Sequence, residues 1–223
     1  MPAELLIAGP SKPIARFLCA HGAGAAMTSP FLEVIAKLLA DRGIATLRFE
    51  FGYMAARRRG EGRKPPPRAE RLMDEYKAAV AAVPADQAPL LIGGKSMGGR
   101  VASLVADELH AAGRIAGLVC LGYPFHPPNK PEQLRTAHLE HLACPALIVQ
   151  GERDPFGGRG EVEGYKLSPA IRIHWVGDGD HDLGPRGGSG FTRKGNLAGA
   201  ADAVAVFARN LEPDRKGPPK IDA

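Results

Sequence analysis

The stretch LLIGGKSMGGRVASL, residues 90–104, decides the fold. It starts with an apolar run, passes a pair of glycines on each side of Lys-Ser-Met, and continues with apolar residues at helical spacing. This order predicts a buried strand, a sharp turn and a helix, with Ser96 on the turn. Such a turn requires glycines near the serine, because larger side chains would collide with the strand and the helix. Ser96 is therefore the first candidate for a reactive side chain.

The rest of the chain alternates apolar runs with helical patterns in the same way. Besides the strand at Leu90–Gly93, strands are predicted over residues 4–8, 14–20, 44–51, 115–121, 145–150 and 171–176. Helices are predicted over residues 30–43, 68–83, 97–112, 132–142, 161–167 and 197–211. Strands that form continuous apolar runs between helices indicate an α/β fold, a mostly parallel sheet with helices on both faces. We expect residues 1–211 to form one domain and residues 212–223 to be a disordered tail.

Two further polar side chains follow strands of this predicted sheet. Asp154, in GERDPFG, comes just after the strand at 145–150, and His181, in GDGDHDL, just after the strand at 171–176. Because ligands of such sheets bind beyond the carboxyl ends of the strands, these two residues and Ser96 are expected to meet there. A serine nucleophile needs a base that takes its proton, and the base needs a carboxylate that orients it. The three residues predict a catalytic triad that cleaves an ester-like acyl bond.

Acyl transfer also requires N–H donors for the oxyanion that develops on the substrate. The backbone N–H of Met97, directly after the serine, is one candidate. The other is the N–H of Ala23, in the HGAG segment that follows the strand at 14–20. We interpret His21, in the same segment, as a hydrogen-bonded structural histidine.

Several alternatives stay open for the acid and the base. Glu152 could replace Asp154 as the acid that orients the histidine. Three further acids flank the histidine and are interpreted as turn formers: Asp178, Asp180 and Asp182. Lys95 could serve as the base in a Ser–Lys mechanism, but we expect it to be structural and to pair with a carboxylate such as Glu50.

The net charge of +5 comes from one segment. Residues 57–68, RRRGEGRKPPPR, carry six basic groups and one acidic group, and the remainder of the chain has 23 of each. We interpret this segment as a mobile loop, with recognition of an anionic substrate or partner as the alternative. Nucleic-acid binding is disfavoured because no aromatic platform accompanies the basic run.

Other features of the composition narrow the class of protein. No apolar run approaches the ~20 residues that a membrane-spanning helix needs, so we expect no membrane partner. Three cysteines without C-x-x-C spacing predict buried, reduced thiols and a cytoplasmic protein. His138 and His141 lie three residues apart with no third ligand nearby, so no metal site is predicted. The sequence implies no cofactor and carries no signal for an oligomer.

Taken together, these segments resemble the α/β-hydrolase superfamily, in its small dienelactone-hydrolase-like branch, from Ile14 to Leu211. GGKSMGGR and GYPFHPPNKPEQLRTAHL, with GERDPFG and GDGDHDL, look like the group around the testis-expressed α/β-hydrolase-like proteins. The resemblance implies a minimal hydrolase without a large cap domain, acting on a small-molecule acyl substrate. Dienelactone hydrolase has a cysteine nucleophile where Ser96 stands, so its substrate is not carried over. A non-catalytic binding or scaffold protein on the same fold is the alternative function.

Overall fold

A seven-stranded sheet runs through the computed structural model, which describes residues 4–211. The strands lie in the order β1-β3-β2-β4-β5-β6-β7. Their bounds are β1 (Leu6–Ala8), β2 (Ala15–Ala20), β3 (Ile44–Phe49), β4 (Leu90–Lys95), β5 (Gly117–Leu121), β6 (Ala146–Gly151) and β7 (Ile171–Val176). Strands β2 to β7 are parallel, and β1 pairs antiparallel with β3 at one edge. The prediction of a mostly parallel sheet is confirmed.

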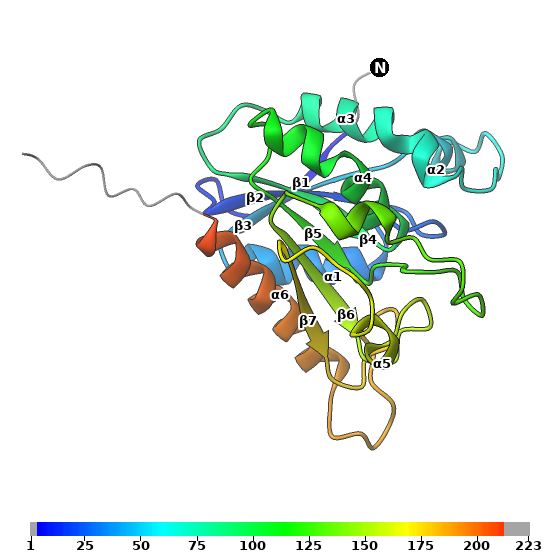
Figure 1. The fold of residues 1–223 in the computed structure, drawn as a ribbon. Coiled ribbons are helices and arrows are strands. Elements are labelled where there is room, and N and C mark those ends of the chain that lie inside the picture. The colour runs from blue at the N-terminus through cyan, green and yellow to red at the C-terminus, as the bar shows by residue number, and fades with distance from the viewer. Residues whose placement is uncertain (1–3, 212–223) are drawn as a thin grey trace, which may run out of the picture.

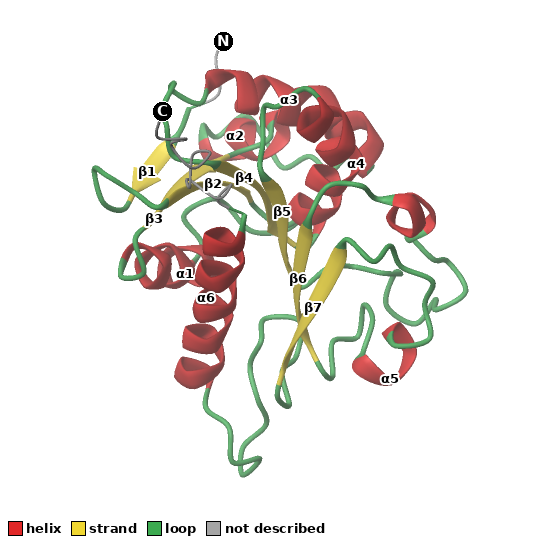
Figure 2. Cartoon of the chain, turned by 60° about the vertical axis from the view of Figure 1, so that its left-hand side comes forward, coloured by secondary structure: helices red, strands yellow, loops and turns green. Residues whose placement is uncertain are grey.

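Helices cover both faces of this sheet (Figures 1 and 2). Their bounds are α1 (Pro30–Ala40), α2 (Gly52–Arg58), α3 (Met73–Ala82), α4 (Met97–Ala111), α5 (Arg159–Val162) and α6 (Arg193–Asn210), with 3-10 turns η1 (Ala69–Leu72) and η2 (Ala137–His141). One apolar core lies between the sheet and α3 with α4, and a second lies between the sheet and α1 with α6. Strands β3 to β6 are buried along their whole length because both of their faces pack against helices.

The predicted strands are all present, whereas some predicted helices differ in extent. Helix α2 takes the first two residues of the predicted loop. It was not predicted, because only Met54 of the helix is buried and its sequence has no apolar stripe. The helix predicted over residues 132–142 is only the 3-10 turn η2, in a segment that three prolines precede, Pro127, Pro128 and Pro131. Helix α6 starts at Arg193, four residues earlier than predicted, with the Thr192 side chain accepting from the Gly195 N–H as an N-cap.

Four further predictions concern the cysteines, a cap domain, membrane-spanning helices and the C-terminal tail. Cys19, Cys120 and Cys144 are buried free thiols, and burial raises the pKa of Cys19 to about 12, which keeps that thiol protonated. Within residues 4–211, no segment forms a cap domain over the sheet, and no helix is both long and apolar enough to cross a membrane. The tail predicted over residues 212–223 lies outside the described residues.

Candidate active site

Ser96 occupies a strained turn between β4 and α4. Its backbone has φ 51° and ψ −116°, a conformation that non-glycine residues rarely adopt. The neighbouring glycines make the turn possible, because a Cβ on Gly94 would lie 2.3 Å from the Ala20 carbonyl oxygen and one on Gly98 2.6 Å from it. The turn therefore lifts the Ser96 hydroxyl beyond the carboxyl end of β4, as the sequence predicts.

His181, in the loop after β7, meets this hydroxyl. The distance between Ser96 Oγ and His181 Nε2 is 2.9 Å, and that between His181 Nδ1 and Asp154 Oδ2 is 2.8 Å. Because an ionised carboxylate only accepts hydrogen bonds, Nδ1 carries the proton, and Nε2 is then free to accept from Ser96. The ring of Phe156 lies against the imidazole, with 4.3 Å between the ring centroids. The structure thus joins the three predicted residues in one hydrogen-bonded chain.

Asp154 is held by a buried polar network that the sequence analysis missed. Its side chain is fully buried, and Oδ1 accepts from the Phe156 backbone N–H at 2.9 Å. Gln150, at the end of β6 and also fully buried, donates from Nε2 to Asp154 Oδ2 at 3.0 Å. The same amide accepts from the Tyr123 N–H and donates to the Gly157 carbonyl. A polar residue ending a predicted buried strand, as Gln150 does, is the signal that could have identified it.

The other acidic residues nearby have different partners. Glu152 accepts from the Asp178 N–H and pairs with Arg159. Asp178 binds the Arg186 guanidinium, which lowers the pKa of that carboxyl to about 2. Asp180 closes its own turn by accepting from the N–H groups of Asp182 and Gly184, as expected of a turn former. Within residues 4–211, only Asp154 among the acids hydrogen-bonds to the imidazole of His181.

Lys95 supports the histidine loop and pairs with a carboxylate, as expected, but that carboxylate is Asp182 and not Glu50. Its Nζ donates to the backbone carbonyl of His181 at 2.7 Å and lies 3.3 Å from Asp182 Oδ1. Glu50 is bound instead by Arg58 of α2, a helix that the sequence analysis did not anticipate. Burial lowers the pKa of Lys95, and the carboxylate of Asp182 opposes this effect.

Two predicted oxyanion donors, the N–H groups of Ala23 and Met97, line the same cleft as Ser96. The cleft has a volume of about 520 Å³. Among the described residues, neither N–H group donates a hydrogen bond to protein. Tyr53 of α2 donates to the Ala23 carbonyl at 2.9 Å, which fixes this segment. Met97 is the first residue of α4, so its N–H also lies at the positive end of the helix dipole.

His21 anchors the loop that carries Ala23. Its Nδ1 donates to the Gly22 carbonyl at 2.7 Å, and its Nε2 accepts from the Phe51 N–H at 3.1 Å. Burial lowers the pKa of His21, which favours the neutral ring that this pattern needs. The structural interpretation of His21 agrees with these contacts.

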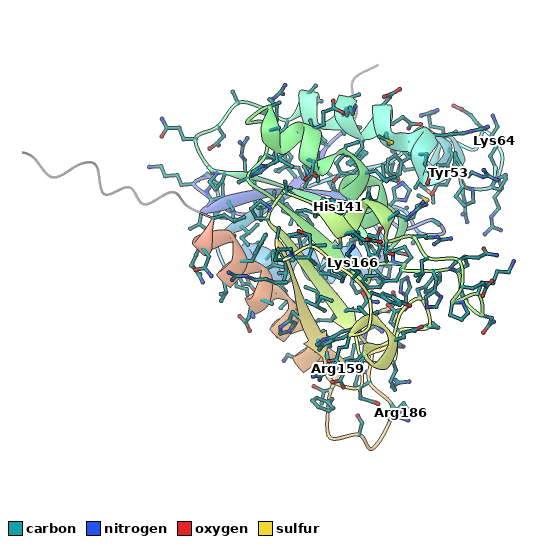
Figure 3. The ribbon with its side chains drawn as sticks, viewed as in Figure 1. Tyr53, Lys64, His141, Arg159, Lys166 and Arg186 are labelled. Atoms are coloured by element: carbon teal, nitrogen blue, oxygen red, sulfur yellow. The ribbon has the colours of Figure 1, made fainter. Side chains whose placement is uncertain are left out.

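Most of the basic segment 57–68 lies away from the cleft. Arg58 pairs with Glu50 and Glu4, and Arg59 pairs with Glu61. Lys64 lies at the rim of the molecule, in the segment after α2 (Figure 3). Of the six basic residues, only Arg68 lines the cleft beside Ser96, together with the preceding Pro66 and Pro67.

A second serine–histidine contact is present on α4, and its geometry differs. The distance between Ser103 Oγ and His138 Nε2 is 2.8 Å. The single Ser103 hydroxyl proton already donates to the Arg100 carbonyl at 2.7 Å, so Ser103 can only accept from His138. This pair therefore packs α4 against η2 and does not activate an oxygen nucleophile.

Residues 4–211 contain no group of three or more His, Cys, Asp or Glu side chains placed to hold a metal ion. No cofactor-binding motif was predicted from the sequence.

Known structures share this fold. The chain is similar to dienelactone hydrolase from Anabaena variabilis, at 18% identity and TM-score 0.69, over 94% of this chain and 99% of the other. It is also similar to an α/β serine hydrolase homologue from Coxiella burnetii, at 19% identity and TM-score 0.65, over 94% and 91%. A lidless α/β serine hydrolase from Xanthomonas campestris matches at 17% identity and TM-score 0.61, over 96% of each chain.

At such identities these likenesses establish the fold alone. A family model for the alpha/beta hydrolase domain matches residues 13–209, which includes every strand from β2 to β7 as well as Ser96, Asp154 and His181. This chain therefore belongs to the α/β-hydrolase family.

Proposed function

We propose that the protein is a serine hydrolase that cleaves an ester-like acyl bond of a small molecule. The observation that carries the proposal is the hydrogen-bonded chain from Ser96 through His181 to Asp154. Family membership supports hydrolysis as the general reaction. Because the three side chains come from loops after three different strands, a chance cluster on a scaffold protein is the weaker explanation.

The reaction follows from the geometry. Ser96 Oγ attacks the acyl carbon while its proton passes to His181 Nε2, and Asp154 stabilises the imidazolium. The N–H groups of Ala23 and Met97 bind the oxyanion of the tetrahedral intermediate. The imidazolium then protonates the leaving alcohol, which leaves an acyl group on Ser96. Water attacks this acyl-enzyme with His181 as base, which releases the acid and restores the Ser96 hydroxyl.

Hydrolysis of a short-chain aryl ester tests the proposal, with two serine variants compared. Ser96→Ala should remain folded and lose turnover by on the order of 10⁶. Ser103→Ala is the matched control, because this serine also contacts a histidine but already donates its proton to a carbonyl. It should keep turnover within about tenfold of wild type. A fully folded wild type without activity on any aryl ester would favour a scaffold role.

The proposed location of the protein is the cytoplasm. The free buried thiols fit a reducing compartment of this kind.

A further inference from the structure

The cleft beside Ser96 is strongly basic for its size. Three arginines line it, Arg68, Arg100 and Arg135, and only one acid does so, Glu70. These arginines come from the end of the basic segment, the first turns of α4 and the segment between β5 and η2. Two of the three lie outside the run of charges that the sequence makes conspicuous.

Arg100 is bound to the elbow that presents the nucleophile. Its backbone N–H donates to the Ser96 carbonyl at 3.0 Å, so its Cα is one helical turn from the reactive serine. One terminal nitrogen of its guanidinium donates to Glu70. Its Nε is buried and has no hydrogen-bond partner among the described residues. Because this Nε is inaccessible, a ligand in the cleft can reach Arg100 only through a terminal nitrogen of the guanidinium.

Arg135 is fixed at both sides of its backbone and free at its tip. Its N–H donates to the Phe125 carbonyl at 2.7 Å, and its carbonyl accepts from the Tyr123 hydroxyl at 3.1 Å. Within residues 4–211, its partly buried guanidinium has no carboxylate partner and donates no hydrogen bond to protein. Burial lowers the pKa of Arg135, and repulsion from Arg100 lowers it further. Two guanidinium groups that repel each other in one cleft would both be stabilised by an anion between them.

Several arginines elsewhere in the protein pair with acids. Arg42 pairs with Asp202, Arg159 with Glu163 and Glu152, and Arg186 with Asp178. In the cleft, three arginines share a single acid, Glu70, which pairs with Arg100 and leaves Arg135 without a carboxylate partner among residues 4–211.

We infer that this cleft binds substrates that carry an anionic group, a carboxylate or a phosphate, beside the scissile acyl bond. Arg100 and Arg135 hold the anionic group, because planar guanidinium groups bind such oxygens in pairs of hydrogen bonds. Arg68 adds charge at the exposed edge of the cleft. The inference rests on the proposed hydrolysis at Ser96 and specifies the class of ester that this site selects.

A matched pair of esters tests the inference: the 4-nitrophenyl monoester of adipic acid, which bears a free carboxylate, and neutral 4-nitrophenyl hexanoate. The measured quantity is the ratio of kcat/KM for the anionic ester to kcat/KM for the neutral ester. In the wild type this ratio should exceed one and fall as salt is raised. In Arg135→Gln it should fall by about tenfold or more, because a charge-assisted pair is lost.

Arg114→Gln is the matched control, since Arg114 is exposed in the turn after α4, at the opposite end of that helix from Ser96. Its ratio should equal that of the wild type. Arg135→Lys should give an intermediate ratio, because it keeps the charge and loses the paired geometry. Equal ratios in wild type and Arg135→Gln, with both esters hydrolysed, would overturn the inference and leave the hydrolase intact. Failure of both esters would instead overturn the hydrolase. A phosphate-bearing ester preferred over the adipate would identify phosphate as the anion.

Discussion

The carboxylate of Asp154 orients His181, and it can do so only because its own position is fixed. The Phe156 N–H and the Gln150 amide leave it one direction for the third hydrogen bond, the one toward the imidazole. Glu152, the alternative acid, is occupied by the Asp178 N–H and Arg159. Turnover should therefore depend on Asp154 and not on Glu152.

Asp154→Asn should reduce kcat by about 10⁴ with little change in KM, because the amide favours the wrong imidazole tautomer. Steady-state kinetics on an aryl ester measure both constants. Glu152→Gln, which keeps the shape of its side chain, should change kcat by less than about tenfold. A larger loss in Glu152→Gln than in Asp154→Asn would show that the acid is misassigned.

Lys95→Met should lower the free energy of unfolding by about 1–3 kcal/mol, because the hydrogen bond to the His181 carbonyl is lost. Urea denaturation measures the stability, and turnover is measured on the folded fraction. The Ser–Lys alternative makes the opposite prediction for the two readouts. It would be supported by unchanged stability together with abolished turnover.

At the scale of elements, the turn between β4 and α4 depends on close approach of the α4 backbone to the loop after β2. A Cβ on Gly98 would lie 2.6 Å from the Ala20 carbonyl oxygen and 2.7 Å from that of His21. Gly98→Ala should therefore destabilise the protein by about 1–3 kcal/mol through overpacking. Gly199→Ala, a helical glycine of α6 with open space around it, should instead stabilise by about 0.5–1 kcal/mol. Denaturant midpoints of the two variants on the same side of wild type would contradict this.

The packing of α4 against η2 predicts a pH dependence. Burial lowers the pKa of His138 to about 4, below the ordinary value of about 6.5 for an unfolded chain. The unfolded state therefore binds the extra proton first, and stability falls as pH decreases from about 6.5 toward 4. His138→Gln should lose less stability than wild type in this window. His141→Gln, at an exposed position in the same turn (Figure 3), should follow the wild-type curve. Parallel curves for wild type and His138→Gln would contradict the prediction.

The elements also show what the sequence could and could not predict. Strands β2 to β7 were predictable because each is rich in apolar residues. Ser96, Asp154 and His181 were predictable because each follows such a strand. Helix α2 was not, because its position depends on tertiary contacts such as that of Glu75 with the Gly52 N–H. Arg135 was missed because nothing in the sequence around it places it beside Arg100; only the folded cleft does so.

At the scale of the whole molecule, two apolar cores hold the sheet between helix layers (Figure 2). The site lies beyond the carboxyl ends of the strands, where Ser96, Asp154 and His181 follow β4, β6 and β7. The sequence suggests a basic patch at residues 57–68, whereas the fold neutralises Arg58 and Arg59 with acids. The fold instead places two arginines from outside this segment, Arg100 and Arg135, in the cleft beside Ser96. Charge along the chain was thus a poor guide to charge at the site.

The central claim is that Ser96 is an activated nucleophile, and covalent labelling tests it most directly. A fluorophosphonate probe reacts with a serine only where a base takes its proton. The account predicts stoichiometric labelling of the wild type, located by peptide mass spectrometry at Ser96. It also predicts equal labelling of Ser103→Ala and none of Ser96→Ala. A folded wild type that stays unlabelled, or that is labelled at Ser103, would contradict the account.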